Sequence, residues 1–319
     1  MTAPTIYRSS DASAPVLTGT AGDLVNLLDK CLVLGYGAKA NAGWSRKTAF
    51  AGNTTTRAAF QQGGGNQLYL DVDDRGATGV LTGATGKEAA VRGYEAMTDV
   101  STGTNPFPTT AQIAAATGNW RKSATADAVP RGWFLVADDR TFMLAVLDGD
   151  TLGTYKVYYF GDIYSLKTGD SYRTGILTRS SVNGASSNGT IGTAVATAIS
   201  SSSTLGWYLA RIAAATGTSA NPSLIVIGSS WETAVTFAGS LDGNIYLQRV
   251  LTSDAASGTI LRGWLRGVYE ILQPIGLADG DTFDGAGDFA GRSFIVVKGF
   301  GGSTLQAMAI ETTAWDTSS

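Results

Sequence analysis

The side chains that could do chemistry in this chain are mainly carboxylates. Its 319 residues include no histidine and a single cysteine, Cys31. Histidine is the usual base of catalytic triads and the commonest metal ligand, so its absence excludes Ser-His-Asp and Cys-His mechanisms and histidine-bound zinc. One cysteine also excludes an internal disulfide and a multi-cysteine zinc site. We interpret Cys31 as a small buried hydrophobic residue.

An acidic, glycine-rich segment near the C-terminal end has the composition of a cation-binding loop. Its carboxylates belong to Asp279, Asp281, Asp284 and Asp288. Calcium takes several carboxylate and carbonyl oxygens on a tight turn, but Phe283 stands where an EF-hand needs a ligand and no glutamate closes the loop. Aspartates in such turns also bond to their own backbone. We therefore predict a structural turn without metal, and calcium binding by the four aspartates is the weaker alternative.

Phosphate-binding and glycosidase patterns fail on spacing or context. Gly86 and Lys87 match the end of a P-loop, but Leu81 replaces its first glycine and Glu88 replaces its Ser or Thr. The glycines of 285–290 precede a strand, whereas a dinucleotide fingerprint opens a helix. Glycosidases need two paired carboxylates, and nothing in the sequence pairs the candidates. These candidates are Glu95, Glu232 and Glu270. We predict that the chain is not an enzyme and uses no cofactor.

Aromatic residues beside arginine and glycine are the broadest chemical signal. The chain has seven tryptophans and twelve tyrosines. Trp, Tyr and Arg dominate protein–protein hot spots, although aromatic side chains also bind sugars and also fill strand cores. We single out as interaction candidates Trp120, Arg121, Trp133, Arg262 and Trp264.

One amphipathic helix is predicted over about residues 21–34. Its apolar face repeats with the i, i+3, i+4, i+7 spacing of a helix. That face consists of Leu24, Leu27, Leu28, Cys31 and Leu32. Asp23 suits the positive end of the helix, and Gly35 suits its C-terminal stop.

The rest of the chain is predicted to be mainly β, with an antiparallel sandwich or barrel architecture, because short β-branched and aromatic runs alternate with turn residues. The clearest unit is a hairpin of Trp133–Ala137 and Thr141–Val146 joined by an acidic turn. Further strands are expected at Gln67–Val72, Tyr155–Phe160, Tyr172–Leu177, Leu224–Ile227, Asn244–Val250, Ile260–Leu272, Ser293–Lys298 and Gln306–Glu311.

Composition suggests a division into segments. Residues 1–20 are expected to form an N-terminal arm that orders against a neighbour, and residues 21–180 a β-rich domain. The Ser/Gly/Thr-rich run 181–204 reads as a loop or linker, and residues 205–319 as a second domain or the second half of the same one. A weak echo links the two halves: Asn66–Leu70 precedes Val91–Glu95 much as Asn244–Leu247 precedes Leu261–Trp264. Two related β units from a duplication are one interpretation, and chance resemblance in a glycine-rich chain is the other.

Charge and hydropathy limit the classes of partner that the chain is expected to bind. Charged residues make up only 15% of the chain and the net charge is −3, whereas nucleic-acid binders cluster Lys and Arg. The first residues lack a secretory signal, and no run approaches the length of a membrane-spanning helix. We expect no nucleic-acid partner, no membrane insertion, and assembly in a cytoplasm.

Five short segments of the chain stand out as a set: Tyr7–Gly19, Arg92–Val100, Asn105–Thr109, Val136–Phe142 and Phe160–Ser165. Taken together in this order, they resemble segments of a group of uncharacterised structural proteins of tailed bacteriophages and prophages. The resemblance spans most of the chain and offers no catalytic residues to transfer. It implies a virion protein of the tail, baseplate or head–tail region.

The low charge, the missing catalytic chemistry and this resemblance favour one functional hypothesis. The chain is expected to be a structural tail or baseplate component that assembles with copies of itself and with other virion proteins. A capsid decoration or head-fibre protein is the first alternative. A module that binds a host surface glycan or receptor is the second, and a depolymerase is the third.

Overall fold

The computed structural model describes residues 2–76, 87–109, 112, 118–147, 155–178, 206–212, 223–225, 245–254, 260–271, 276–298 and 307–316. Within this part the fold is mainly β, as the sequence predicts, with three antiparallel sheets and one short helical segment near the N-terminus. The predicted linker 181–204 and residues 83–86 of the P-loop-like segment lie outside the described residues.

The middle sheet holds the predicted hairpin at its centre. Its strands, in spatial order, are β1 (Thr5–Arg8), β8 (Gly132–Ala137), β9 (Thr141–Leu147), β10 (Tyr155–Asp162), β12 (Thr174–Leu177) and β13 (Trp207–Leu209). Alternate side chains enter two different apolar clusters: Leu135 and Leu144 enter one, and Val136 and Met143 enter the other. The sheet is therefore covered on both faces, which explains why β8 and β9 are almost continuously apolar.

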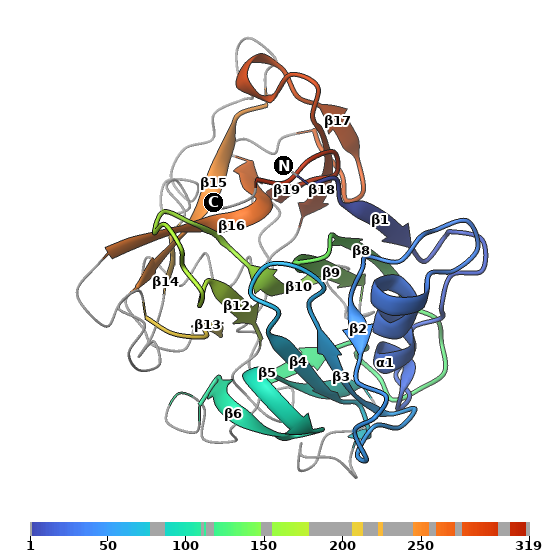
Figure 1. Cartoon of the computed structure of the whole chain (residues 1–319). Helices are drawn as coiled ribbons and strands as arrows, with labels where there is room; N and C mark the ends of the chain where they lie inside the picture. Colours follow the sequence, from blue (N-terminus) through green and yellow to red (C-terminus); the bar gives the residue numbers. More distant parts are fainter. Residues whose placement is uncertain are drawn as a thin grey trace.

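The second sheet, from the N-terminal half, covers one face of the middle sheet together with the helix (Figure 1). Its strands are β2 (Ser45–Arg46), β3 (Arg57–Gln61), β4 (Tyr69–Asp73), β5 (Glu88–Asp99) and β6 (Thr102–Phe107), with β7 (Gly118–Arg121) also paired to β5. The shared cluster includes Val72 and Trp120 from this sheet and Phe142 from the middle sheet.

The third, C-terminal sheet covers the other face. Its strands are β14 (Ser223–Ile225), β15 (Leu247–Asp254), β16 (Ile260–Ile271), β19 (Ala307–Glu311), β18 (Ser293–Lys298) and β17 (Thr282–Asp284), with β11 (Tyr164–Ser165) also paired to β16. Val268 and Ile310 pack with Tyr159 of the middle sheet. The protein is thus a stack of three sheets, and β11 and β13 place segments from both sides of 181–204 in shared sheets.

The predicted helix is present over its expected range, with a change of type halfway. It runs as α1 (Asp23–Leu28) and continues as a π-helix, η1 (Asp29–Leu34). The predicted apolar face is fully buried, Cys31 included. Gly35 follows with a φ of 82°, a value that favours glycine. A third short helix, η3 (Gly287–Phe289), is a 3₁₀ turn near β18.

The N-terminal segment is part of the fold and not a free arm, contrary to the sequence-based expectation. β1 pairs with β8 along its whole length, and Tyr7 is fully buried. Thr2 and Trp315 form an antiparallel bridge, which places the two ends of the described chain side by side (Figure 1). The sequence gives little sign of this strand, because it has only four residues and is flanked by a proline and by polar residues.

Both halves of the sequence echo are antiparallel strand pairs, but their registers differ. Leu70 lies opposite Gly93 in the first pair. In the second pair Leu247 lies opposite Ile271, and Gly263 lies opposite Thr252. Gly263 has a φ of 157°, whereas Gly93 is not among the residues with positive φ. The two strand pairs therefore share a sequence pattern but neither the register nor the conformation of the glycine.

Candidate functional site

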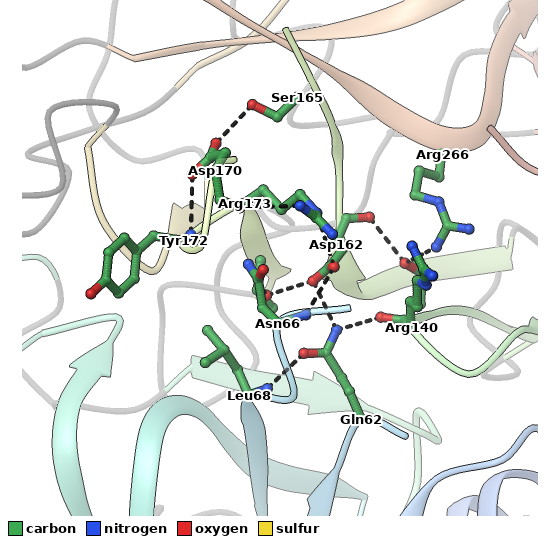
Figure 2. Close-up of polar contacts among 12 residues, drawn as sticks. Gln62, Asn66, Leu68, Arg140, Asp162, Ser165, Asp170, Tyr172, Arg173 and Arg266 are labelled. Carbon is green, nitrogen blue, oxygen red and sulfur yellow. Dashed lines mark hydrogen bonds and ion pairs between the residues drawn. The ribbon is translucent and has the colours of Figure 1, made fainter. Parts of the chain in front are cut away.

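A buried polar junction joins the middle sheet to the N-terminal sheet (Figure 2). Asp162, at the end of β10, has a side chain that is 1% exposed, and its carboxylate accepts four hydrogen bonds. The donors are Gln62 Nε2 at 3.1 Å, the Asn66 backbone N–H at 3.2 Å, Arg173 Nε at 3.1 Å and Thr174 Oγ1 at 2.7 Å. A carboxylate with donors on both oxygens is held in one position. We interpret Asp162 as an anchor between sheets.

Three consecutive glycines, Gly63, Gly64 and Gly65, lie beside this junction and allow the N-terminal sheet to approach the middle sheet closely. The backbone N–H groups of Gly63 and Gly64 both donate to the Asp139 carbonyl at 3.0 Å. A β-carbon on Gly64 would lie 2.2 Å from Asp139 Oδ2, and one on Gly65 would lie 2.1 Å from Asp162 Oδ2. These separations are far shorter than a van der Waals contact, so side chains at these positions would displace the carboxylates.

Strand β16 carries a tandem Leu-Arg-Gly sequence at residues 261–263 and 265–267, and each copy forms an irregularity in the sheet. The register with β15 shifts between Thr252 and Ser253 and again between Arg249 and Leu251. Gly263 and Gly267 have φ values of 157° and 67°. Bulges of this kind re-aim side chains.

Each irregularity directs an arginine into the interior. Arg262 donates to both oxygens of Asp170 at 2.8 and 2.9 Å, and both side chains are at most 2% exposed. Arg266 donates to Asp138 Oδ2 at 2.5 Å and to Asp138 Oδ1 at 3.2 Å, with similar burial. Asp138 belongs to the turn of the central hairpin, so Arg266 links the C-terminal sheet to the middle sheet.

Three of the predicted interaction candidates lie in the interior of this chain. Trp120 and Trp133 are 1% and 2% exposed, and their indole N–H groups donate to the Leu177 and Pro15 carbonyls. Arg262 is buried by its ion pair. Arg121 is half-buried, and its backbone N–H and C=O both bond to the Tyr158 hydroxyl. The contacts of these four residues are made within the chain and stabilise the fold.

Trp264 differs, because it is half-buried and belongs to a surface row of aromatic and charged side chains. Its ring stacks on Tyr164 at a centroid distance of 4.1 Å, and the Arg249 guanidinium lies 4.1 Å from its centroid. Two groups this close to one centroid must occupy opposite faces of the indole. Trp264 is therefore fixed between an aromatic ring and a cation.

The row continues from Arg249 through two carboxylates. Asp316 accepts from Arg249 at 3.1 Å and lies 3.9 Å from Arg292. Arg292 in turn donates to Glu311 at 3.2 Å. We call this set the aromatic–arginine row; its members are Tyr164, Trp264, Arg249, Asp316, Arg292 and Glu311.

The two ends of the row differ in their exposure. Glu311 is buried, and this burial raises the pKa of its carboxyl against the opposing charge of Arg292. Arg249 has a side chain that is 39% exposed. Leu166 and Leu261, near the Tyr164 end, are 53% and 43% exposed. The row therefore offers solvent a combination of arginine, aromatic and aliphatic surface.

The acidic loop does not gather its carboxylates. No group of three or more His, Cys, Asp or Glu side chains suited to hold a metal occurs in the described part of the chain. Asp281 accepts from the Ala278 backbone N–H at 2.6 Å, and Asp284 accepts from the Ser293 hydroxyl at 2.6 Å. Asp281 makes a local turn contact and Asp284 makes a contact across the β17–β18 pair. The calcium alternative at Asp279, Asp281, Asp284 and Asp288 gains no support from the geometry.

Sequence reasoning missed Arg266, Asp138, Asp162 and Asp170. The tandem Leu-Arg-Gly sequence was the available signal for Arg266, because a glycine after each arginine marks a repeated backbone irregularity. The aspartates carried no such signal, since turn aspartates are common and their partners lie up to 128 residues away.

Comparison with known proteins adds no family: no family model matches the chain, and no curated protein matches its sequence. The described part contains no helix that is long and apolar enough to cross a membrane.

Proposed function

We propose that this chain is a structural component of a tailed-phage virion, placed in the tail or baseplate, and that it acts by contact with copies of itself and with other virion proteins rather than by catalysis. The observation that carries the proposal is the aromatic–arginine row beside exposed Leu166 and Leu261. Its composition is that of a protein–protein hot spot. The segments that resemble phage structural proteins add support.

The internal ion pairs support a structural role over a catalytic one. Asp138 and Asp170 each hold an arginine of the C-terminal sheet, and Asp162 accepts hydrogen bonds from Gln62 and Asn66 of the N-terminal half. Carboxylates used in this way fix the sheets relative to one another. A subunit that must keep its shape within an assembly benefits from such links.

The row favours a protein partner over a glycan. Sugars stack on a free aromatic face, but both faces of Trp264 are occupied, by Tyr164 and Arg249. A protein partner can instead use the exposed arginine and the neighbouring leucines. We therefore place the contact at this end of the C-terminal sheet.

The proposal is tested in two steps. Mass spectrometry of purified particles should detect the chain, and light scattering of the isolated protein should show an oligomer. Leu166→Asp and Leu261→Asp should shift the oligomer toward monomer, whereas Val129→Asp, at another exposed apolar residue, should not. A protein that is monomeric and absent from particles would exclude this function, and a position on the capsid surface in a particle map would exclude the tail assignment.

A further inference from the structure

A lysine and an aspartate meet inside the apolar core between the N-terminal and middle sheets. Lys122 Nζ lies 2.5 Å from Asp74 Oδ1, and the two side chains are 1% and 0% exposed. Asp74 follows β4 and Lys122 follows β7, so side-chain alternation directs them to the face that carries Val72 and Trp120. Both of those residues belong to the core cluster shared with the middle sheet.

The other contacts of this pair orient it for reaction. Asp74 Oδ2 accepts the Leu24 backbone N–H at 2.9 Å, at the start of α1. Lys122 Nζ also donates to the Thr20 carbonyl. The carboxyl carbon thus has the amine on one oxygen and a fixed backbone donor on the other. That donor lies where it would stabilise negative charge on Oδ2.

Burial favours the neutral form of both groups. It raises the pKa of Asp74 to about 6, against the opposing charge of Lys122. The same burial lowers the pKa of Lys122. A lysine can lose its proton in this way, whereas the guanidinium groups of Arg262 and Arg266 cannot. This pair therefore differs in kind from the buried arginine pairs.

We propose that Lys122 and Asp74 condense spontaneously to an intramolecular isopeptide bond that ties the end of β4 to the end of β7. A proton first passes from Nζ to Oδ1, which leaves a neutral amine and a carboxylic acid. The Nζ lone pair attacks Cγ, and Oδ2 carries the negative charge under the Leu24 N–H. Nζ then releases a second proton to the Oδ1 hydroxyl, which leaves as water while the Cγ–Nζ amide forms.

The fold supplies what this step needs without another reactant. The two groups are already in contact, which replaces a bimolecular encounter. The surrounding core excludes bulk water and so protects the product from hydrolysis. Once formed, the bond would hold the segment before α1, through Thr20 and Leu24, against the N-terminal sheet.

The experiment is the intact mass of the wild-type protein after denaturation. We expect a mass lower by one water molecule than the sequence requires, and a branched tryptic peptide that contains both Asp74 and Lys122. A succinimide at an Asp-Gly pair, such as Asp279-Gly280, also loses one water, and the branched peptide distinguishes the two products. A wild-type protein that keeps its full mass after long incubation near pH 6 would overturn the proposal.

Matched variants assign the reacting atoms. Lys122→Arg keeps the charge but should retain the full mass, and Lys39→Arg, in a partly exposed pair with Asp11, should still lose water. Asp74→Asn should form the same linked peptide with loss of ammonia. Loss of water that persists in Lys122→Arg would place the reaction elsewhere and overturn the assignment. The mass of the wild-type protein tests the proposal by itself, so the test remains valid even if a variant fails to fold.

Discussion

Gly65 lies against Asp162 so closely that a β-carbon on the glycine would stand 2.1 Å from Oδ2 of the carboxylate. The same glycine has a φ of 63°, in the left-handed region. Backbone conformation and space both require glycine here, because the turn that carries Gly65 docks the N-terminal sheet onto the end of β10.

Gly65→Ala should therefore destabilise the protein by about 3 kcal/mol, the sum of backbone strain and displacement of Asp162. Gly169 is the matched control, because its φ of 65° is nearly the same but nothing lies within 4 Å of its added β-carbon. Gly169→Ala should cost only about 1 kcal/mol. Urea unfolding of both variants measures the difference, and equal losses would show that space at Asp162 does not matter.

Removal of Arg266 should be more damaging than removal of a surface charge. Arg266→Met leaves Asp138 charged in the interior, and we expect a loss of about 3–5 kcal/mol. The double variant Arg266→Met/Asp138→Asn should recover part of this loss, since the buried charge is removed with its partner. Lys39→Met should change stability by less than about 1 kcal/mol. Thermal unfolding provides the comparison, and a double variant no better than the single one would contradict the argument.

Cys31 should be inert to thiol reagents in the folded protein. It is fully buried on the π-helical part of the helix, and burial raises the pKa of its thiol. Reaction then requires unfolding, so a disulfide reagent should label native protein slower than urea-unfolded protein by several orders of magnitude. Rapid labelling of native protein, measured by absorbance, would show that the helix opens locally.

The helix and the central hairpin of the middle sheet were predictable because their signals are local. The apolar spacing of residues 24–32 is visible in any short window, and the hairpin of β8 and β9 shows two apolar runs around an acidic turn. Strand β6 was missed for the opposite reason. It contains Gly103, Asn105 and Pro106 and is largely exposed at a sheet edge, so neither propensity nor alternation marks it.

The candidate sites were less predictable, because their partners are distant in sequence. Arg262 and Trp264 stand two residues apart in similar sequence, yet one is buried on Asp170 and the other lies in the surface row. The irregular register of β16 decides between these positions, and it depends on pairing with β15 and β11. The residue types of Arg262 and Trp264 suggest that both make contacts. Only the course of the β16 backbone shows that the contact of Arg262 is internal.

The pH dependence of stability should include a contribution from Asp71. This carboxyl is 5% exposed, and burial raises its pKa from 3.8 to about 6, against hydrogen bonds from Ser101 and the charge of Arg57 that lower it. The folded state therefore binds more protons than the unfolded state between these two values. Stability from Asp71 is complete below about pH 4 and is lost as the pH rises through about 6, by roughly 3 kcal/mol at most.

Asp71→Asn isolates this contribution. The amide keeps the size of the carboxyl and can still accept from the Ser101 backbone N–H, now at 3.1 Å from Asp71 Oδ1. Urea unfolding at pH 4, 5, 6 and 7 should show the wild type losing stability relative to the variant as the pH rises. Carboxylates that do not interact with Asp71, such as Asp170 with its lowered pKa, act equally in both proteins. A difference that stays constant across this range would mean that Asp71 titrates alike in the folded and unfolded chains.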